Sequence, residues 1–82
     1  MNNIKSDNLL VSVCVQTYNH EKYIKQCLDS ILAQVTSFDF EIILGEDDSN
    51  DNTRNICIDY AKNSPEKIKL FLRHRKDVIY IN

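Results

Sequence analysis

The stretch FEIILGEDDSNDNT, residues 40–53, joins an apolar run to a strongly acidic turn. Residues 40–44 are mostly apolar, which is typical of a strand covered on both faces. Four carboxylates then crowd into residues 45–53, here called the acidic turn, and like charges this close together repel one another. Folding alone would not favour such a turn, so the sequence predicts that the acidic turn has a binding role.

Two further apolar runs predict strands near residues 10–15 and 68–72. After the first of these runs, apolar side chains recur at helical spacing and predict a helix near residues 20–34, with Asn19 as its expected N-cap. A second helix is expected near residues 52–63. The chain therefore alternates strand, helix, strand, helix and strand.

This order, with crossovers of such length, implies parallel neighbouring strands and right-handed connections. The predicted fold class is α/β, a Rossmann-like βαβαβ unit that forms the opening half of a doubly wound sheet. Residues 1–8 are expected to be a flexible lead-in, and residues 9–82 the N-terminal part of a domain.

The right-handedness of the connections leads to a second expectation. Two right-handed crossovers in one direction place both helices on the same face of the sheet. All three predicted strands look apolar on both faces. We therefore expect the sheet to be incomplete as it stands. Its bare face would be covered by more of the domain, by self-association or by a partner chain.

Composition narrows the class of protein. The net charge of −2 argues against electrostatic binding of nucleic acid or anionic lipid. The cysteines are odd in number and lack C-x-x-C spacing, which favours a reduced, cytoplasmic setting; Cys14, Cys27 and Cys57 are each expected to be small buried hydrophobic residues. The apolar run at residues 9–15 is too short to span a membrane, and no basic segment of a secretory signal precedes it.

The topology predicts where a ligand binds. Ligands of doubly wound sheets lie outside the carboxyl ends of the strands, where the acidic turn and the stretch QTYNHE, residues 16–21 and here called the first turn, both lie. The acidic turn has only Gly45 and is anionic, so it does not suit a phosphate cradle. Carboxylates accept hydrogen bonds, and their partners are N–H and O–H donors of a base or sugar, or a metal ion.

Two other interpretations of the acidic turn stay open. A calcium loop is suggested by four side chains with EF-hand spacing, Asp48, Asn50, Asn52 and Asp59. Against it, Thr53 stands where an EF-hand needs glycine, and a strand precedes the loop. The turn can also be a solvated helix start, in which Ser49 and Asp51 are caps.

The two stretches together, residues 11–34 and 40–53, resemble the start of family 2 glycosyltransferases, which have the nucleotide-sugar-binding GT-A fold. In that family an apolar strand runs into T-Y-N, an amphipathic helix follows, and E-I-I precedes an acidic D-D-G-S-x-D-x-T turn. The resemblance covers roughly residues 9–72. It implies binding of a nucleotide-diphosphate sugar, typically a UDP-sugar, and transfer to a cell-surface glycan or lipid-linked acceptor.

Carried over by position, the resemblance assigns nucleotide-sugar binding to Thr17, Tyr18, Asn19, Glu21, Glu46, Asp47 and Asp48. Arg73 joins these candidates through its place in the chain, since no motif of the family matches it. Asp47 matches the acid that accepts the N–H of the base. Asp48 stands where the family usually has glycine. Arg73 follows the third predicted strand on the same edge, where it can approach the base or a phosphate.

The resemblance also implies Mg²⁺ or Mn²⁺, held by a D-x-D motif further downstream, and a later carboxylate as catalytic base. Neither has a counterpart in this sequence, so no catalytic residue and no metal ligand is assigned. The chain alone is expected to transfer no sugar, and the complete enzyme to be cytoplasmic or peripheral to the inner face of the membrane. The competing hypotheses are a truncated, non-enzymatic nucleotide-binding or interaction module, and a different Rossmann-like nucleotide binder, whose glycine-rich signature is missing.

Overall fold

A computed structural model describes residues 10–74 and 76–81, so the lead-in predicted for residues 1–8 lies outside the described residues. The described elements, in chain order, are β1 (Leu10–Thr17), α1 (Ile24–Leu32), β2 (Asp39–Asp47), α2 (Thr53–Asn63), β3 (Ile68–His74) and β4 (Asp77–Ile81). The sheet order is β1-β2-β3-β4, with the first two pairs parallel and the last pair antiparallel. The predicted α/β class with a parallel sheet is confirmed.

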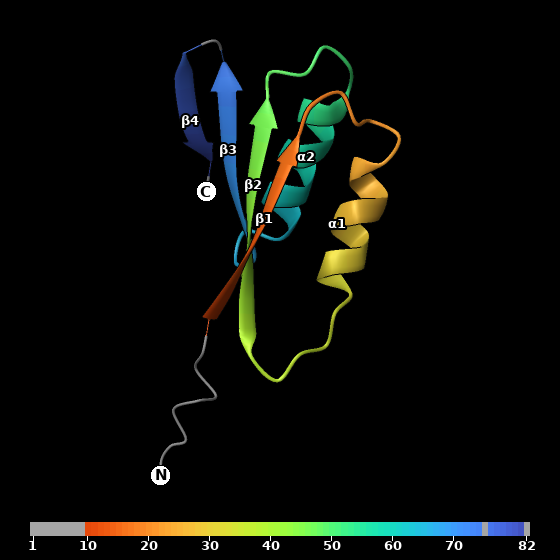
Figure 1. Cartoon of the computed structure of the whole chain (residues 1–82), viewed down its shortest axis with the longest axis vertical. Helices are drawn as coiled ribbons and strands as arrows, with labels where there is room; N and C mark the ends of the chain where they lie inside the picture. The colour runs from red at the N-terminus through yellow and green to blue at the C-terminus, as the bar shows by residue number, and fades with distance from the viewer. Residues whose placement is uncertain (1–9, 75, 82) are drawn as a thin grey trace.

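Both helices lie on the same side of the sheet, as the handedness argument predicts (Figure 1). Their apolar faces meet alternate residues of the strands, so that Ile42, Leu44 and Leu70 are fully buried beneath Leu28 of α1 and Cys57 of α2. Burying one such leucine side chain contributes about 1.5–3 kcal/mol. The core is therefore a single layer between the sheet and two helices.

The opposite face of the sheet, which no described helix covers, is more polar than predicted. On β1 it presents exposed Ser12, Cys14 and Gln16, and the Ser12 hydroxyl donates to the Glu41 carboxylate on β2 at 2.6 Å. Apolar side chains are interspersed on this face, among them Leu10 of β1 and Ile43 of β2. Toward the β3–β4 edge, the rings of Phe71 and Tyr80 lie 4.8 Å apart. The expectation that all strands are apolar on both faces is therefore wrong. That another segment or chain covers this face stays a prediction.

Helix α1 is shorter than predicted at both ends. It begins at Ile24 rather than residue 20, and Tyr23 rather than Asn19 occupies the N-cap position. Asn19 instead has a left-handed backbone, with φ of 52°. Val35, just past the end of the predicted helix, is 98% exposed and does not continue its apolar stripe. Within the described residues, neither helix is long and apolar enough to cross a membrane.

The cysteines differ in environment, and only Cys57 is buried as predicted, whereas Cys14 and Cys27 are exposed. Burial, followed by the charge of nearby Glu46, raises the pKa of the Cys57 thiol to about 12. The thiolate is the reactive form of cysteine. We therefore expect iodoacetamide at pH 8 to alkylate Cys14 and Cys27 in the folded protein and to spare Cys57.

Peptide mass spectrometry after brief labelling measures this pattern, and labelling in denaturant is the control in which all three thiols react. Equal labelling of Cys57 and Cys27 in the folded protein would contradict the burial of Cys57.

Candidate functional site

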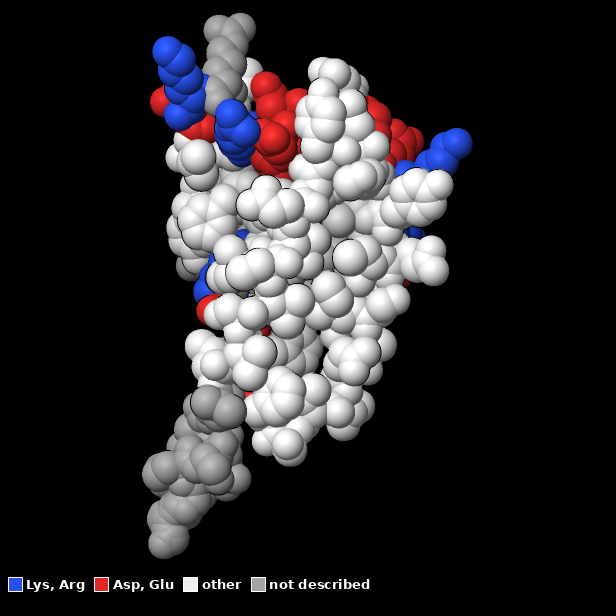
Figure 2. Space-filling model, in the orientation of Figure 1, with Lys and Arg blue, Asp and Glu red and all other residues white. Residues whose placement is uncertain are grey.

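The three parallel strands end together at one end of the sheet. In the ladder Thr17 of β1 pairs with Glu46 of β2, and Asp47 of β2 pairs with Arg73 of β3. Figure 2 shows acidic side chains gathered at this end of the molecule, with basic side chains beside them and a mostly uncharged surface below. The first turn and the acidic turn thus share one edge, as the topology predicts.

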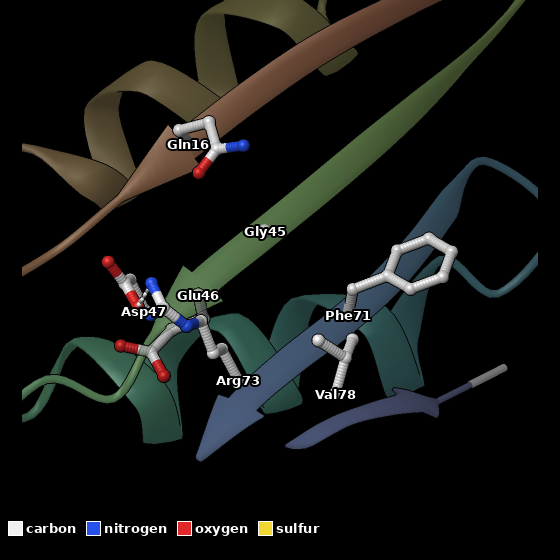
Figure 3. A pocket seen from close by; sticks show the side chains of 7 residues that line it. All are labelled: Gln16, Gly45, Glu46, Asp47, Phe71, Arg73 and Val78. Atoms are coloured by element: carbon white, nitrogen blue, oxygen red, sulfur yellow. Dashed lines mark hydrogen bonds and ion pairs between the residues drawn. The ribbon is translucent and has the colours of Figure 1, made fainter. Parts of the chain in front are cut away.

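An open pocket of about 290 Å³ lies at these strand ends and is lined by Gln16, Gly45, Glu46, Asp47, Phe71, Arg73 and Val78. Figure 3 shows the side chains of Asp47 and Arg73 turned toward one another. The Arg73 guanidinium donates to Asp47 Oδ1 at 2.8 Å, and the two side chains are 58% and 42% exposed. An ion pair this exposed contributes only about 0–1 kcal/mol, so a ligand can displace it at low cost.

A smaller pocket of about 190 Å³ adjoins the same edge and is lined by Gln16, Thr17, Tyr18, His20 and Asp47. Thr17 and Asp47 thus line one pocket, as predicted. Thr17 is buried, with its hydroxyl 3.2 Å from His20 Nδ1, whereas the Tyr18 side chain is half exposed. An exposed phenol ring beside a carboxylate offers a planar ligand both a stacking surface and a hydrogen-bond acceptor.

Glu46 has a different environment from Asp47, although the two are neighbours in the chain. Its side chain is fully buried on the helix side of the sheet, where Arg54 Nε donates to it at 2.7 Å and the Ser49 N–H at 2.9 Å. Arg54 also donates to the backbone carbonyl of Arg73. Glu46 therefore ties the acidic turn to α2 and β3, and its contact with a nucleotide stays a prediction. The sequence reasoning missed the role of Arg54, although it directly follows the acidic turn in the chain, which is a natural place for a counter-ion.

Asn19 of the first turn contacts the acidic turn directly. Its backbone N–H donates to the Ser49 hydroxyl at 2.9 Å, and its side-chain Oδ1 accepts from the Asn50 N–H at 2.8 Å. The next N–H along the chain, that of His20, donates to the Thr53 hydroxyl at 2.9 Å. In this structure Asn19 therefore joins the two turns, and its contact with a nucleotide stays a prediction.

Glu21 also bonds to the acidic turn through both its backbone and its side chain. Its N–H donates to Asp51 Oδ2 at 3.2 Å, and its Oε1 accepts from the Asn52 N–H at 2.9 Å. Asp51 in turn accepts from the Thr53 N–H at 2.9 Å, next to the start of α2. The pKa of the Asp51 carboxyl is lowered, chiefly because the Thr53 hydroxyl donates to it. Asn52, rather than the predicted Asp51 or Ser49, occupies the N-cap position of α2. Asp51 bonds the Thr53 N–H from one residue earlier, and Ser49 bonds across to the first turn.

With this geometry established, comparison with known proteins decides the family: residues 12–80 match the family model Glycosyl transferase family 2. The chain belongs to this family. It is 37% identical to an uncharacterized glycosyltransferase of Nostoc sp. over 72% of this chain, and 49% identical to the uncharacterized glycosyltransferase EpsJ of Bacillus subtilis over 65%. It is also 39% identical over 80% of its length to the minor teichoic acid biosynthesis protein GgaB of Bacillus subtilis.

The chain spans only a small part of these relatives. The matched regions make up 18%, 15% and 7% of the three proteins. Membership of family 2 is therefore a statement about this segment, and the activity and substrates of a whole enzyme are matters for proposal.

The structure gives no support for a metal ion within this segment. Among residues 10–74 and 76–81, no group of three or more His, Cys, Asp or Glu side chains is placed to hold one. Asp59, the last residue of the EF-hand spacing, lies inside helix α2, which begins at Thr53 within the would-be calcium loop. The described residues therefore do not form a calcium loop, and the Mg²⁺ or Mn²⁺ that the resemblance implies for the complete enzyme stays a prediction.

Asp48 has a left-handed backbone, with φ of 56°, at the position where family 2 usually has glycine. An L-residue in this conformation is strained by roughly 1–2 kcal/mol, and glycine is not. We expect Asp48→Gly to exceed Asp48→Ala by about 1 kcal/mol in free energy of unfolding, as measured by urea denaturation. Both variants lose the same exposed contacts to Arg54 and His74, so their difference isolates the backbone. An alanine variant as stable as the glycine variant would show that the turn relaxes.

Proposed function

We propose that this family 2 chain binds the uridine diphosphate part of a nucleotide-diphosphate sugar at the strand-end edge. In the complete enzyme the sugar would pass to a cell-surface glycan or lipid-linked acceptor. The name of the similar protein GgaB, a minor teichoic acid biosynthesis protein, supports this class of product. Exposed free Cys14 and Cys27 suit a reducing compartment, so we propose that the chain functions in the cytoplasm.

The observation that carries the proposal is the half-exposed carboxylate of Asp47, held beside the guanidinium of Arg73 in an open pocket. Uracil presents a ring N–H flanked by two carbonyl oxygens. A carboxylate accepts the N–H, and a guanidinium beside it can donate to a carbonyl oxygen or a phosphate. The exposed ring of Tyr18 lies next to the same edge and can stack on the base.

The chemistry of sugar transfer is not part of what we assign to the described residues. Loss of a diphosphate needs its negative charge to be neutralised, whereas this edge carries the half-buried Asp48 and the exposed Asp51. Nucleotide binding by the chain alone should therefore be weak and independent of a metal. A non-enzymatic nucleotide-binding module would use the same pocket, and only a transfer assay on a longer protein separates the two.

The test is a calorimetric titration of the chain with UDP and CDP, each with and without Mn²⁺. The two nucleotides form a matched pair, because uracil has a hydrogen on ring nitrogen N3 and cytosine has a lone pair there. One charged hydrogen bond is worth about 1.5–3 kcal/mol, so UDP should bind at least about ten-fold more tightly than CDP. Equal affinities would contradict recognition of uracil by a carboxylate.

A further inference from the structure

The ladder between β1 and β2 ends at the pair Thr17 and Glu46, and beyond it the two turns are held together by side chains. Five hydrogen bonds cross between them, and each joins a backbone N–H of one turn to a side-chain oxygen of the other. We propose that Asn19 and Glu21 are positioning residues, which hold Tyr18 and Asp47 at a fixed spacing for the base rather than contacting the nucleotide. This inference rests on the proposed function.

These five hydrogen bonds, here called the joint, run in both directions between the two turns and hold them rigidly together. Asn19 and Glu21 each donate through the backbone and accept through the side chain, at 2.8–3.2 Å. The N–H of His20, between them, donates to Thr53. Three consecutive N–H groups of the first turn are thus bonded to the acidic turn. Backbone donors are rarely left without partners, so shifting one turn against the other would break several bonds at once.

The residue types suit this role. The left-handed backbone of Asn19 is tolerated by asparagine better than by most residues, and it brings the carboxamide oxygen to the Asn50 N–H. Glycine at this position would keep the backbone and lose the oxygen. At Glu21 the acceptor is Oε1, which glutamine also provides without the charge. Asn19→Gly therefore removes the acceptor and keeps the backbone conformation, whereas Glu21→Gln keeps the acceptor and removes the charge.

The joint lies next to the proposed contacts in the chain. Tyr18 immediately precedes Asn19, and Asp47 is two residues before Ser49, to which the Asn19 N–H donates. A base held between Tyr18 and Asp47 would lose alignment if the turns moved apart, and binding groups must be held to about 0.5 Å for good recognition. Loosening the joint should therefore weaken binding without removing any group that touches the nucleotide.

The experiment measures UDP affinity and thermal stability of the 82-residue chain and of four variants. Asn19→Gly and Glu21→Ala each remove one acceptor and should weaken UDP binding at least about five-fold. Glu21→Gln restores the acceptor and should bind UDP within about two-fold of the wild type. Tyr60→Phe is the control, because it removes a hydrogen bond from the Tyr60 hydroxyl to Asp29 that joins the two helices away from the pocket. It should lower stability and leave UDP affinity unchanged.

Amide hydrogen exchange gives a readout that needs no ligand. Protection of the Asn50 N–H should fall in Asn19→Gly, and protection of the Asn52 N–H should fall in Glu21→Ala and return in Glu21→Gln. Wild-type UDP affinity in Asn19→Gly and Glu21→Ala would overturn the positioning role and leave the proposed function standing. Equal weakening by Glu21→Gln and Glu21→Ala would also overturn it, because the charge would then matter more than the joint. A wild-type chain that binds no UDP would overturn the proposed function and this inference together.

Discussion

Replacing Glu46 by alanine is expected to lower the free energy of unfolding by about 3–5 kcal/mol. The Glu46 side chain is fully buried, and it accepts from Arg54 at 2.7 Å and from the Ser49 N–H at 2.9 Å. Removing it leaves a guanidinium that is only 26% exposed without its nearest counter-ion, together with a backbone donor that has lost its acceptor. A domain of this size has a total stability of roughly 4–12 kcal/mol, so the loss would remove about a quarter or more of it and, at the lower end of that range, unfold much of the population.

Urea denaturation followed by circular dichroism measures this effect. Glu66→Ala is the matched control, because Glu66 is exposed and its loss should change stability by less than about 0.5 kcal/mol. Replacing both Glu46 and Arg54 by leucine should recover more than half of the lost stability, since the unpaired charge is then absent. A loss below about 1 kcal/mol for Glu46→Ala would mean that water enters and solvates Arg54.

The elements that could be predicted are those whose pattern reflects burial. β2 and β3 are the central strands of the described sheet. Alternate residues of both strands are buried against the helices, and most of the residues between them are partly buried by the neighbouring strands, which explains their apolar runs. The start of α1 was placed too early because residues 19–21 donate to side chains of the acidic turn rather than continuing the helix. Contacts between residues 30 positions apart leave no periodic trace in a sequence.

Strand β4 lay outside the predicted elements for a related reason. It pairs only with β3, at the edge of the described sheet, and Val78, Ile79 and Tyr80 are all exposed. Burial therefore imposes no alternation on it. The sequence Arg-Lys that precedes it at residues 75–76 also lacks the Asn-Gly or Asp-Gly pair that usually signals a tight hairpin.

The site was predictable in outline because the edge of a parallel sheet gathers the turns after its strands. The resemblance treated Glu46 and Asp47 as a pair, but successive side chains of a strand point to opposite faces. Glu46 has the parity of Ile42 and Leu44, and this signal in the sequence already places it against the helices. Asp47 has the other parity and faces the pocket.

That parity makes Asp47 the residue whose loss should affect binding most. Asp47→Asn is expected to weaken UDP binding by about 1.5–3 kcal/mol, or roughly 10- to 150-fold, because a charged acceptor becomes a neutral amide of the same shape. The side chain is 42% exposed, so the fold should be little affected. Calorimetric titration of wild type and variant with UDP measures the change.

The control for this substitution must be another carboxylate, one whose hydrogen bonds do not hold the fold together. Asp51 is unsuitable, because it accepts from the backbone of Glu21 and of Thr53 and so holds both turns. Asp59→Asn, on the exposed side of α2, is the better match and should leave UDP affinity within about two-fold of the wild type.

The preference for UDP over CDP shows whether Asp47→Asn removes a hydrogen bond to the base or disturbs the pocket in general. The new amide of Asp47→Asn can donate an N–H to the N3 lone pair of cytosine, which the carboxylate cannot do. The ratio of CDP to UDP dissociation constants should therefore fall toward one in the variant, through weaker UDP binding and stronger CDP binding. If Asp47→Asn weakens both nucleotides equally, Asp47 acts through the phosphates or through Arg73 rather than by accepting the N–H of the base. If Asp47→Asn and Asp59→Asn have the same effect, the base does not lie at Asp47.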